Sequence, residues 1–179
     1  QRLFKGLKPT LLSLYDFPSL LNIDESGSSY LQNAKSKALL VSRATERVSL
    51  GDDSGLEVDC LGGSPGIFSS RYGLNDEQRN EKLLRELKDA PSHWRGACFK
   101  CALALALPDG KVIVAEGECR GMIAFEPKGK GGFGYDPIFF VPELNQTIAQ
   151  LSPEIKDKIS HRGKAFARLR ELLPRYLLL

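Results

Sequence analysis

The order of apolar and polar residues predicts a domain that mixes helices and strands. Apolar residues that recur every three or four positions indicate helices, and short alternating or continuous apolar runs indicate strands. The expected helices cover residues 29–43, 77–88, a short stretch from 153, and 162–173; the expected strands lie near 97–107, 111–119, 121–126 and 137–141. Helices and strands do not alternate strictly. We therefore expect one α/β domain over residues 1–179, with a long, twisted, mixed sheet and flanking helices.

Two of these helices have capping residues at their starts. Asn75 precedes Gln78 by three positions, which resembles a capping box in front of an amphipathic helix. Ser152 followed by Pro153 places a serine at the N-cap and a proline at the first helical position. In the helix after Asn75, the side chains expected to face the core are Leu83, Leu84 and Leu87.

The segment GDDSG, at residues 51–55, combines two carboxylates, a hydroxyl and two glycines. It lies between stretches at 47–50 and 56–61 that have strand character, so the acids are expected in a tight turn between two strands. One interpretation is an acidic hairpin turn with a local role, since Asp and Gly favour turns. The other is a Mg²⁺ site, because magnesium takes oxygen ligands and is often bound by one or two carboxylates with substrate phosphates.

A glycine-rich loop, GKGGFG at residues 129–134, fits a dinucleotide-binding pattern but precedes YDPIFF instead of a helix. The Rossmann interpretation therefore fails. The loop either contacts a ligand through its open backbone or is a strand entry with core aromatic residues. Its candidate ligand contacts are the cations Lys128 and Lys130, the rings of Phe133 or Tyr135, and the carboxylate of Asp136.

A third polar segment, KDKISHR at residues 156–162, brings several hydrogen-bond donors close together in the chain. Ser160 and His161 are adjacent, so their side chains diverge in a regular element, and a serine-hydrolase pair is excluded. His161 alone would more often be structural than catalytic. With the two preceding segments, these donors suit a phosphorylated ligand that has a carbonyl group.

The composition is that of a compact globular domain, with 42% hydrophobic residues, 26% charged residues and a net charge of +3. No signal peptide and no apolar run of membrane length is present in the sequence. Basic residues gather near the C-terminus but alternate with apolar ones, as on a solvated helix face. We therefore expect no membrane partner and regard nucleic-acid binding as unlikely.

Four cysteines include a C-x-x-C at Cys98 and Cys101. This pair falls in an expected strand, where side chains three positions apart point to opposite faces and cannot chelate one ion. Cys60 and Cys119 are isolated in the sequence. We expect four reduced thiols and a cytoplasmic protein.

Several motifs together resemble one known family. They are DDSGLEVD at 52–59, GSPG at 63–66 with SRY at 70–72, GFGYDPIF at 132–139, and Lys156 with SHR at 160–162. In this order they resemble the inosine triphosphate pyrophosphatase family, from about residue 29 to the last helix. The resemblance implies a two-lobed fold, Mg²⁺ as cofactor and a homodimer. It also implies hydrolysis of non-standard purine nucleoside triphosphates, namely ITP, dITP and XTP, to the monophosphate and pyrophosphate.

The same resemblance suggests roles for individual residues. Asp53 would act as the base, supported by the charge of Asp52, and Asp53 with Gln32 would hold Mg²⁺. Phe133 would stack on the purine. Substrate contacts are expected from Ser54, Lys37, Arg71, Phe133, Gly134, Tyr135, Asp136, Lys156, His161 and Arg162.

Selectivity would come from the edge of the base. Hypoxanthine and xanthine have an O6 acceptor and an N1–H donor, whereas adenine has the reverse. A donor from Arg162 or His161 to O6, and Asp136 accepting from N1–H, would leave adenine mismatched. Guanine shares O6 and N1–H, so its exclusion needs a further contact.

Two departures from the family pattern affect these expectations. The family begins with a strand and a Ser/Thr-x-Asn-x-x-Lys phosphate loop that residues 1–28 do not supply, although residues 1–7 resemble the end of its first helix. The only methionine is Met122, so we expect the segment with the phosphate loop to be missing from this sequence. Gln32 stands where the family usually has glutamate, and a neutral amide is a weaker ligand for Mg²⁺.

Two alternatives remain open. The chain could bind nucleotides without turnover, given Gln32 and the missing phosphate loop. It could also bind RNA through its basic C-terminal region, with a strong dependence on salt.

Overall fold

The computed structural model describes residues 10–20 and 26–175. One sheet has the strand order β2-β1-β3-β4-β5-β6. The strands are β1 (Ser49–Val58), β2 (Pro65–Gly66), β3 (Gly96–Ala106), β4 (Val112–Ile123), β5 (Phe139–Val141) and β6 (Gln146–Thr147), and the helices are α1 (Tyr30–Thr45), α2 (Asp76–Glu86), α3 (Pro153–Ile159) and α4 (His161–Leu172). The expected helix end at residues 1–7 lies outside the described residues.

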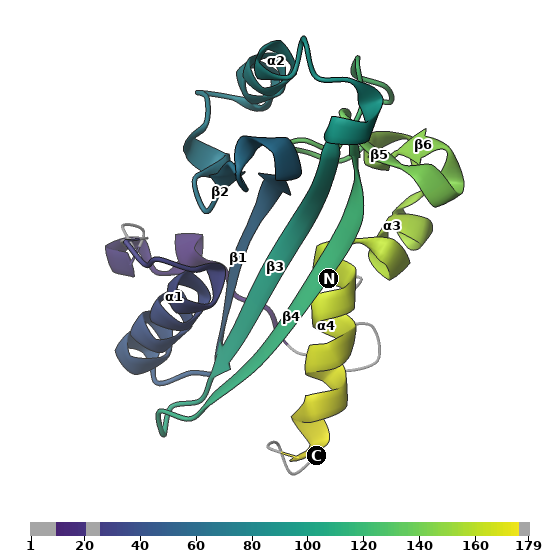
Figure 1. Ribbon diagram of the computed structural model, residues 1–179. Coiled ribbons are helices and arrows are strands. Elements are labelled where there is room, and N and C mark those ends of the chain that lie inside the picture. Colours follow the sequence, from purple (N-terminus) through teal and green to yellow (C-terminus); the bar gives the residue numbers. More distant parts are fainter. Residues whose placement is uncertain (1–9, 21–25, 176–179) are drawn as a thin grey trace. The chain divides into compact units, whose positions relative to one another are not determined.

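The α/β class is confirmed, and the sheet, which we expected to be mixed, is antiparallel. In the pairing of β4 with β5, Met122 lies opposite Phe140; in that of β1 with β2, Leu56 lies opposite Gly66. Strands β3 and β4 follow one another as a long hairpin (Figure 1). A direct hairpin connection makes neighbouring strands antiparallel, so β3 and β4 run in opposite directions.

The chain forms two compact units. The first comprises Gln1–Asp53, Ala102–Glu116 and Ala165–Leu179, and the second comprises Ser54–Cys101 and Gly117–Lys164. Strands β1, β3 and β4 and helix α4 each contribute residues to both units. Each unit has its own buried cluster.

In the first unit, small side chains bring helix α1 close to the sheet (Figure 1). Ala34 and Ala38 of α1 are fully buried against alternate alanines of β3. These alanines are Ala102, Ala104 and Ala106. Because methyl groups replace longer side chains at this contact, the backbones of helix and sheet approach closely.

In the second unit, α2 packs its leucines into a larger core. Leu83 and Leu87 are buried in a cluster with Phe99 and Phe139, and Leu84 packs against it. Arg95 is also buried, and its guanidinium donates to the carbonyls at the end of α2 and of β4. The inner face expected for this helix is therefore confirmed.

The predicted capping residues are also confirmed. Asn75 caps α2 by accepting a hydrogen bond from Gln78 N at 2.9 Å, and Ser152 caps α3 with Pro153 at the first helical position. Gln78 differs from a simple capping box, because its side chain accepts from Leu74 N. The expected helices over 29–43 and 162–173 correspond to α1 and α4.

Three expectations about strands were wrong. Asp52 and Asp53 lie within the continuous strand β1 and not in a turn. Strand β4 continues through Gly121, where two strands were expected, and β5 is shorter than the expected 137–141. A Cβ at Gly121 would lie 2.5 Å from the Phe139 ring, so this glycine makes room for packing and does not end the strand.

Candidate active site

In the first unit, two residues of α1 contact the carboxylate of Asp53. Lys37 Nζ lies 2.9 Å from Asp53 Oδ1, and Asn33 Nδ2 donates to Asp53 Oδ2 over 3.2 Å. Asn33 and Lys37 are four residues apart and therefore share one helix face. Ser29, the N-cap, accepts from Gln32 N and sets where the helix starts. Both oxygens of Asp53 are thus held from a single turn of α1.

Gly51 permits this contact between helix and strand. A Cβ at Gly51 would lie 2.2 Å from the carbonyl oxygen of Ala34. Any side chain there would push α1 away from β1, and Lys37 and Asn33 would lose their reach to Asp53. The glycine that suggested a turn therefore serves close packing two residues before the acid.

The carboxylate oxygens at this position suit a divalent cation. Asp52 and Asp53 offer carboxylate oxygens, which Mg²⁺ prefers, and the ammonium of Lys37 already lies against Asp53. Among residues 10–20 and 26–175, no three His, Cys, Asp or Glu side chains form a group able to hold a metal. A cation here would therefore complete its shell with other oxygen atoms, such as water or phosphate.

Gln32 is placed differently from Asn33. Its side-chain oxygen accepts from Ser28 N and Ser28 Oγ, each at 2.9 Å, and the residue is exposed. Gln32 therefore supports the start of α1. Its expected contact with a metal stays a prediction.

In the second unit, Asp136 organises the glycine loop. Its carboxylate is buried, accepts from Phe133 N at 2.8 Å and pairs with Lys156. Gly132 has a φ of 78°, and a Cβ there would lie 1.9 Å from Asp136 Oδ2. Only glycine fits this position, for reasons of both conformation and space.

Two cations flank the ring of Phe133. Lys156 Nζ lies 4.9 Å and Arg162 Cζ 5.4 Å from the ring centroid, while the residue is 61% exposed. Arg162 also approaches Ser54 Oγ at 3.4 Å. Phe133, Lys156, Arg162, Ser54 and Asp136 thus form one group, which we call the aromatic–cation cluster.

His161 and Arg162 begin α4, and their positions depend on Ser160. Ser160 is buried and its hydroxyl accepts from Gly163 N at 3.1 Å, as an N-cap does. The His161 ring is buried and stacks on Phe99 with centroids 4.7 Å apart. A positive helix end therefore lies beside the cluster. The sequence-based prediction did not assign this capping role to Ser160, although serine directly before a helix is its usual indication.

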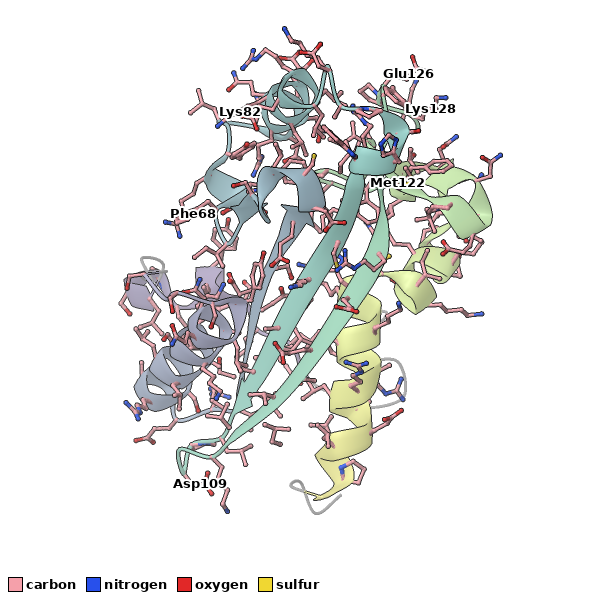
Figure 2. The ribbon with its side chains drawn as sticks, in the orientation of Figure 1. Phe68, Lys82, Asp109, Met122, Glu126 and Lys128 are labelled. Atoms are coloured by element: carbon pink, nitrogen blue, oxygen red, sulfur yellow. The ribbon has the colours of Figure 1, made fainter. Side chains whose placement is uncertain are left out.

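Two further expected substrate residues, Tyr135 and Arg71, make contacts within the protein. Tyr135 is buried, its hydroxyl donates to the carbonyl of Ser69, and burial raises its pKa well above the usual range. Arg71 is exposed, and its guanidinium carbon lies 5.9 Å from the centroid of the Phe68 ring; Phe68 is 57% exposed. Figure 2 labels the side chain of Phe68. Their roles in substrate binding stay predictions.

Gly134 has partners that the sequence-based prediction missed. Its N–H donates to Asp76 and its carbonyl accepts from Asn80, both on α2. The two residues are 58 and 54 positions away from Gly134 in sequence, so no local pattern could have linked them.

These features define an α/β protein of two compact units. In the first unit, Lys37 of α1 pairs with Asp53 of strand β1; in the second, the aromatic–cation cluster lies at a glycine loop. A model of the Ham1 family matches residues 1–172, and the chain belongs to this family. Within the ranges that the structure describes, no helix is long and apolar enough to cross a membrane.

Similar proteins and a solved structure agree with the family. A dITP/XTP pyrophosphatase of Desulforamulus reducens is 46% identical over 175 residues, covering 94% of this chain and 87% of the relative. Another, of Halalkalibacterium halodurans, is 51% identical over 160 residues, covering 88% and 82%. The structure of a HAM1 protein from Coxiella burnetii matches with a TM-score of 0.88 and 39% identity, covering 98% of this chain and 91% of that chain.

Proposed function

We propose that this protein hydrolyses ITP, dITP and XTP to the nucleoside monophosphate and pyrophosphate, and so removes non-standard purines from the nucleotide pool. Its relatives include proteins named dITP/XTP pyrophosphatase. The single observation that supports the proposal most is the exposed Phe133 ring between Lys156 and Arg162, beside the buried Asp136. This group offers a stacking face, cations and an acceptor, which suit a 6-oxo purine with its O6 acceptor and N1–H donor.

Asp53 would prepare the attacking water. In the proposed step, water oxygen bonds to the α-phosphorus, Asp53 accepts the proton, and the bond to the bridging oxygen breaks to release pyrophosphate. Asn33 holds Asp53 Oδ2 and so orients the carboxylate. Lys37 neutralises Asp53 in the free protein and would turn its ammonium toward a phosphate oxygen.

Mg²⁺ is the cofactor we propose, with Asp53 and Gln32 as protein ligands and Asp52 as a supporting charge. When bound, it would supply Lewis acidity that offsets the charge developing on the phosphates. Asp53 would hold it through a hard carboxylate oxygen, and Asp52 would add negative charge nearby. The side chain of Gln32 would have to leave Ser28 to contribute.

The base would be recognised by its hydrogen-bonding edge. Arg162 or His161 would donate to O6, and Asp136 would accept from N1–H, so that adenine presents the wrong groups. Asp136 Oδ2 already accepts from Phe133 N, which keeps the acceptor fixed in place. The remaining roles we propose, as contacts with the substrate, are those of Ser54, Arg71, Gly134 and Tyr135.

Pyrophosphate release from ITP, dITP, XTP, GTP and ATP, with and without Mg²⁺, tests this function. We expect kcat/KM for ITP to exceed that for ATP by about 10⁴-fold, because buried hydrogen-bonding groups are left unpaired by adenine. Comparable values for ITP and ATP would overturn the proposal. Release of orthophosphate in place of pyrophosphate, or binding of ITP without hydrolysis, would also overturn it.

Replacing Gln32 with Glu should lower the Mg²⁺ concentration needed for half-maximal activity, since a carboxylate is a stronger ligand than an amide. A glutamate can still accept from Ser28 N, so the start of α1 should be kept. A Mg²⁺ titration of ITP hydrolysis measures the effect. Gln78→Glu, at the exposed start of α2, is the matched control, and an unchanged requirement in Gln32→Glu would place Gln32 away from the metal.

We further propose a cytoplasmic homodimer. Cys60, Cys98, Cys101 and Cys119 are free thiols, as in reducing compartments, and burial raises the pKa of Cys98 and Cys119. Several large apolar side chains of the second unit are exposed, which suits association with another copy. They are Phe68, Leu74, Trp94 and Phe125.

A further inference from the structure

Helix α2 binds both backbone groups of one glycine in the loop. Gly134 N donates to Asp76 Oδ2 over 2.6 Å, and Asn80 Nδ2 donates to Gly134 O over 3.1 Å. Asp76 and Asn80 are four residues apart, so they lie one above the other on one face of α2. The peptide groups on either side of Gly134 are therefore held by a single helical turn.

Asp76 is itself held in place. Arg79 Nη2 lies 2.7 Å from Asp76 Oδ1, which leaves Oδ2 for Gly134. The same guanidinium donates to the carbonyls of Ser70 at 2.8 Å and Asn75 at 3.2 Å. The carboxylate thus bridges Arg79 and the loop with both of its oxygens in use.

Asn80 is buried, and its Oδ1 has no hydrogen-bond partner among the described residues. An unpaired buried oxygen costs stability, and an apolar side chain would avoid that cost. What the amide supplies in return is its donor to Gly134 O. This balance points to a role for Asn80 in placing the loop and not in stabilising the core.

The residue that this contact places is Phe133. Phe133 is 61% exposed and lies between Gly132 and Gly134, whose φ angles are 78° and 62°. Glycines allow many backbone conformations, so an exposed ring between them keeps one direction only if the backbone is fixed. Asp136 fixes Phe133 N, and Asp76 and Asn80 fix the next residue.

We infer that Asp76 and Asn80 are positioning residues for the purine base, which act by holding Gly134 so that the Phe133 ring stays ready to stack. The inference rests on the proposed function for its substrate. Without either residue, the ring would have to be ordered when the base binds, at the expense of affinity. The steps at phosphorus would be left unchanged.

Asp76→Ala and Asn80→Ala should each raise KM for ITP about tenfold and weaken IMP binding by a similar factor, while kcat stays within about twofold. Affinity for inorganic pyrophosphate should not change. Asp76→Asn keeps one acceptor for Gly134 N, so its KM for ITP should lie between those of the wild type and Asp76→Ala. Glu77→Ala is the matched control, because it removes an exposed acid from the same first turn.

Amide hydrogen exchange at residues 132–136 separates this inference from the proposed function. Faster exchange at Gly134 in Asp76→Ala and Asn80→Ala, but not in Glu77→Ala, would support the contact even if the wild type hydrolysed no triphosphate. Unchanged exchange at Gly134 would overturn it. Unchanged KM and IMP affinity in a protein that hydrolyses ITP would overturn the positioning role, as would an equal loss of pyrophosphate affinity.

Discussion

Replacing Asp53 with Asn is expected to lower kcat for ITP by about 10³-fold or more while the protein stays folded. The amide has nearly the same shape as the carboxylate, but it has one acceptor oxygen, so it can keep the hydrogen bond from Lys37 or the one from Asn33 and not both. It has neither the negative charge that would hold Mg²⁺ nor the basicity that would accept the proton of water. Steady-state rates of pyrophosphate release at saturating ITP and Mg²⁺ measure the effect.

The same substitution should cost little stability. The Lys37–Asp53 pair is partly buried, with side-chain exposures of 18% and 11%, and losing it costs about 1 kcal/mol. In a chain of this size such a loss lowers the melting temperature by about 2–4 °C. A folded variant that retains most of its activity would show that Asp53 is not the base.

Asp59→Asn is the control for the loss of a carboxylate. Asp59 follows the same strand, is 58% exposed and pairs with Arg120 at 3.1 Å. Exposed pairs contribute little to stability, so this variant should keep normal stability and turnover. The kcat of Asp52→Asn should lie between those of Asp53→Asn and Asp59→Asn, because we assign Asp52 a supporting charge only.

Gly132→Ala should lower kcat/KM for ITP about 100-fold or more. Its Cβ would lie 1.9 Å from Asp136 Oδ2, so the carboxylate must move away from Phe133 N and Lys156. The loop would then lose its contact with Asp136, and the acceptor proposed for N1–H would be displaced. Kinetics with ITP and a thermal melt of the same preparation are the measurements.

Gly110→Ala controls for backbone strain. Gly110 has a φ of 87° in the turn between β3 and β4, and a Cβ added there would have no described atom within 4 Å. Alanine at positive φ costs about 1–2 kcal/mol at either site, and Gly132→Ala should lose further stability because its Cβ also displaces Asp136. If Gly110→Ala lost as much activity as Gly132→Ala, general destabilisation would explain the effect. Equal activity of Gly132→Ala and wild type would mean that Asp136 need not keep its position.

Local chemistry predicted the helices well. Asn75 and Ser152 cap α2 and α3 as expected, because an N-cap acts on backbone groups only two or three residues away. The leucine face of α2 was likewise visible in the spacing of Leu83 and Leu87. Strand boundaries were predicted less well, since they depend on partners far away in the sequence.

Two glycines, Gly51 and Gly121, show why strand boundaries were predicted less well. At Gly51 and Gly121 the sequence indicated a turn and a strand end, whereas both positions lie within strands and make room for Ala34 and Phe139. Glycine either adopts a positive φ or allows another group to approach closely, and the residue type alone does not distinguish these two roles. At Gly132 both reasons apply together.

By itself, the sequence determined the α/β class, the helix starts and the group of residues that resemble a purine triphosphate site. Those depend on residue type, short spacings and the order of motifs. Only the tertiary structure decided that Lys37 and Asn33 hold Asp53, that Tyr135 faces the core, and that Asp76 and Asn80 hold Gly134. The physical reason is that a side chain's partner is set by which elements pack together, and residues more than 50 positions apart meet there without any local pattern that records it.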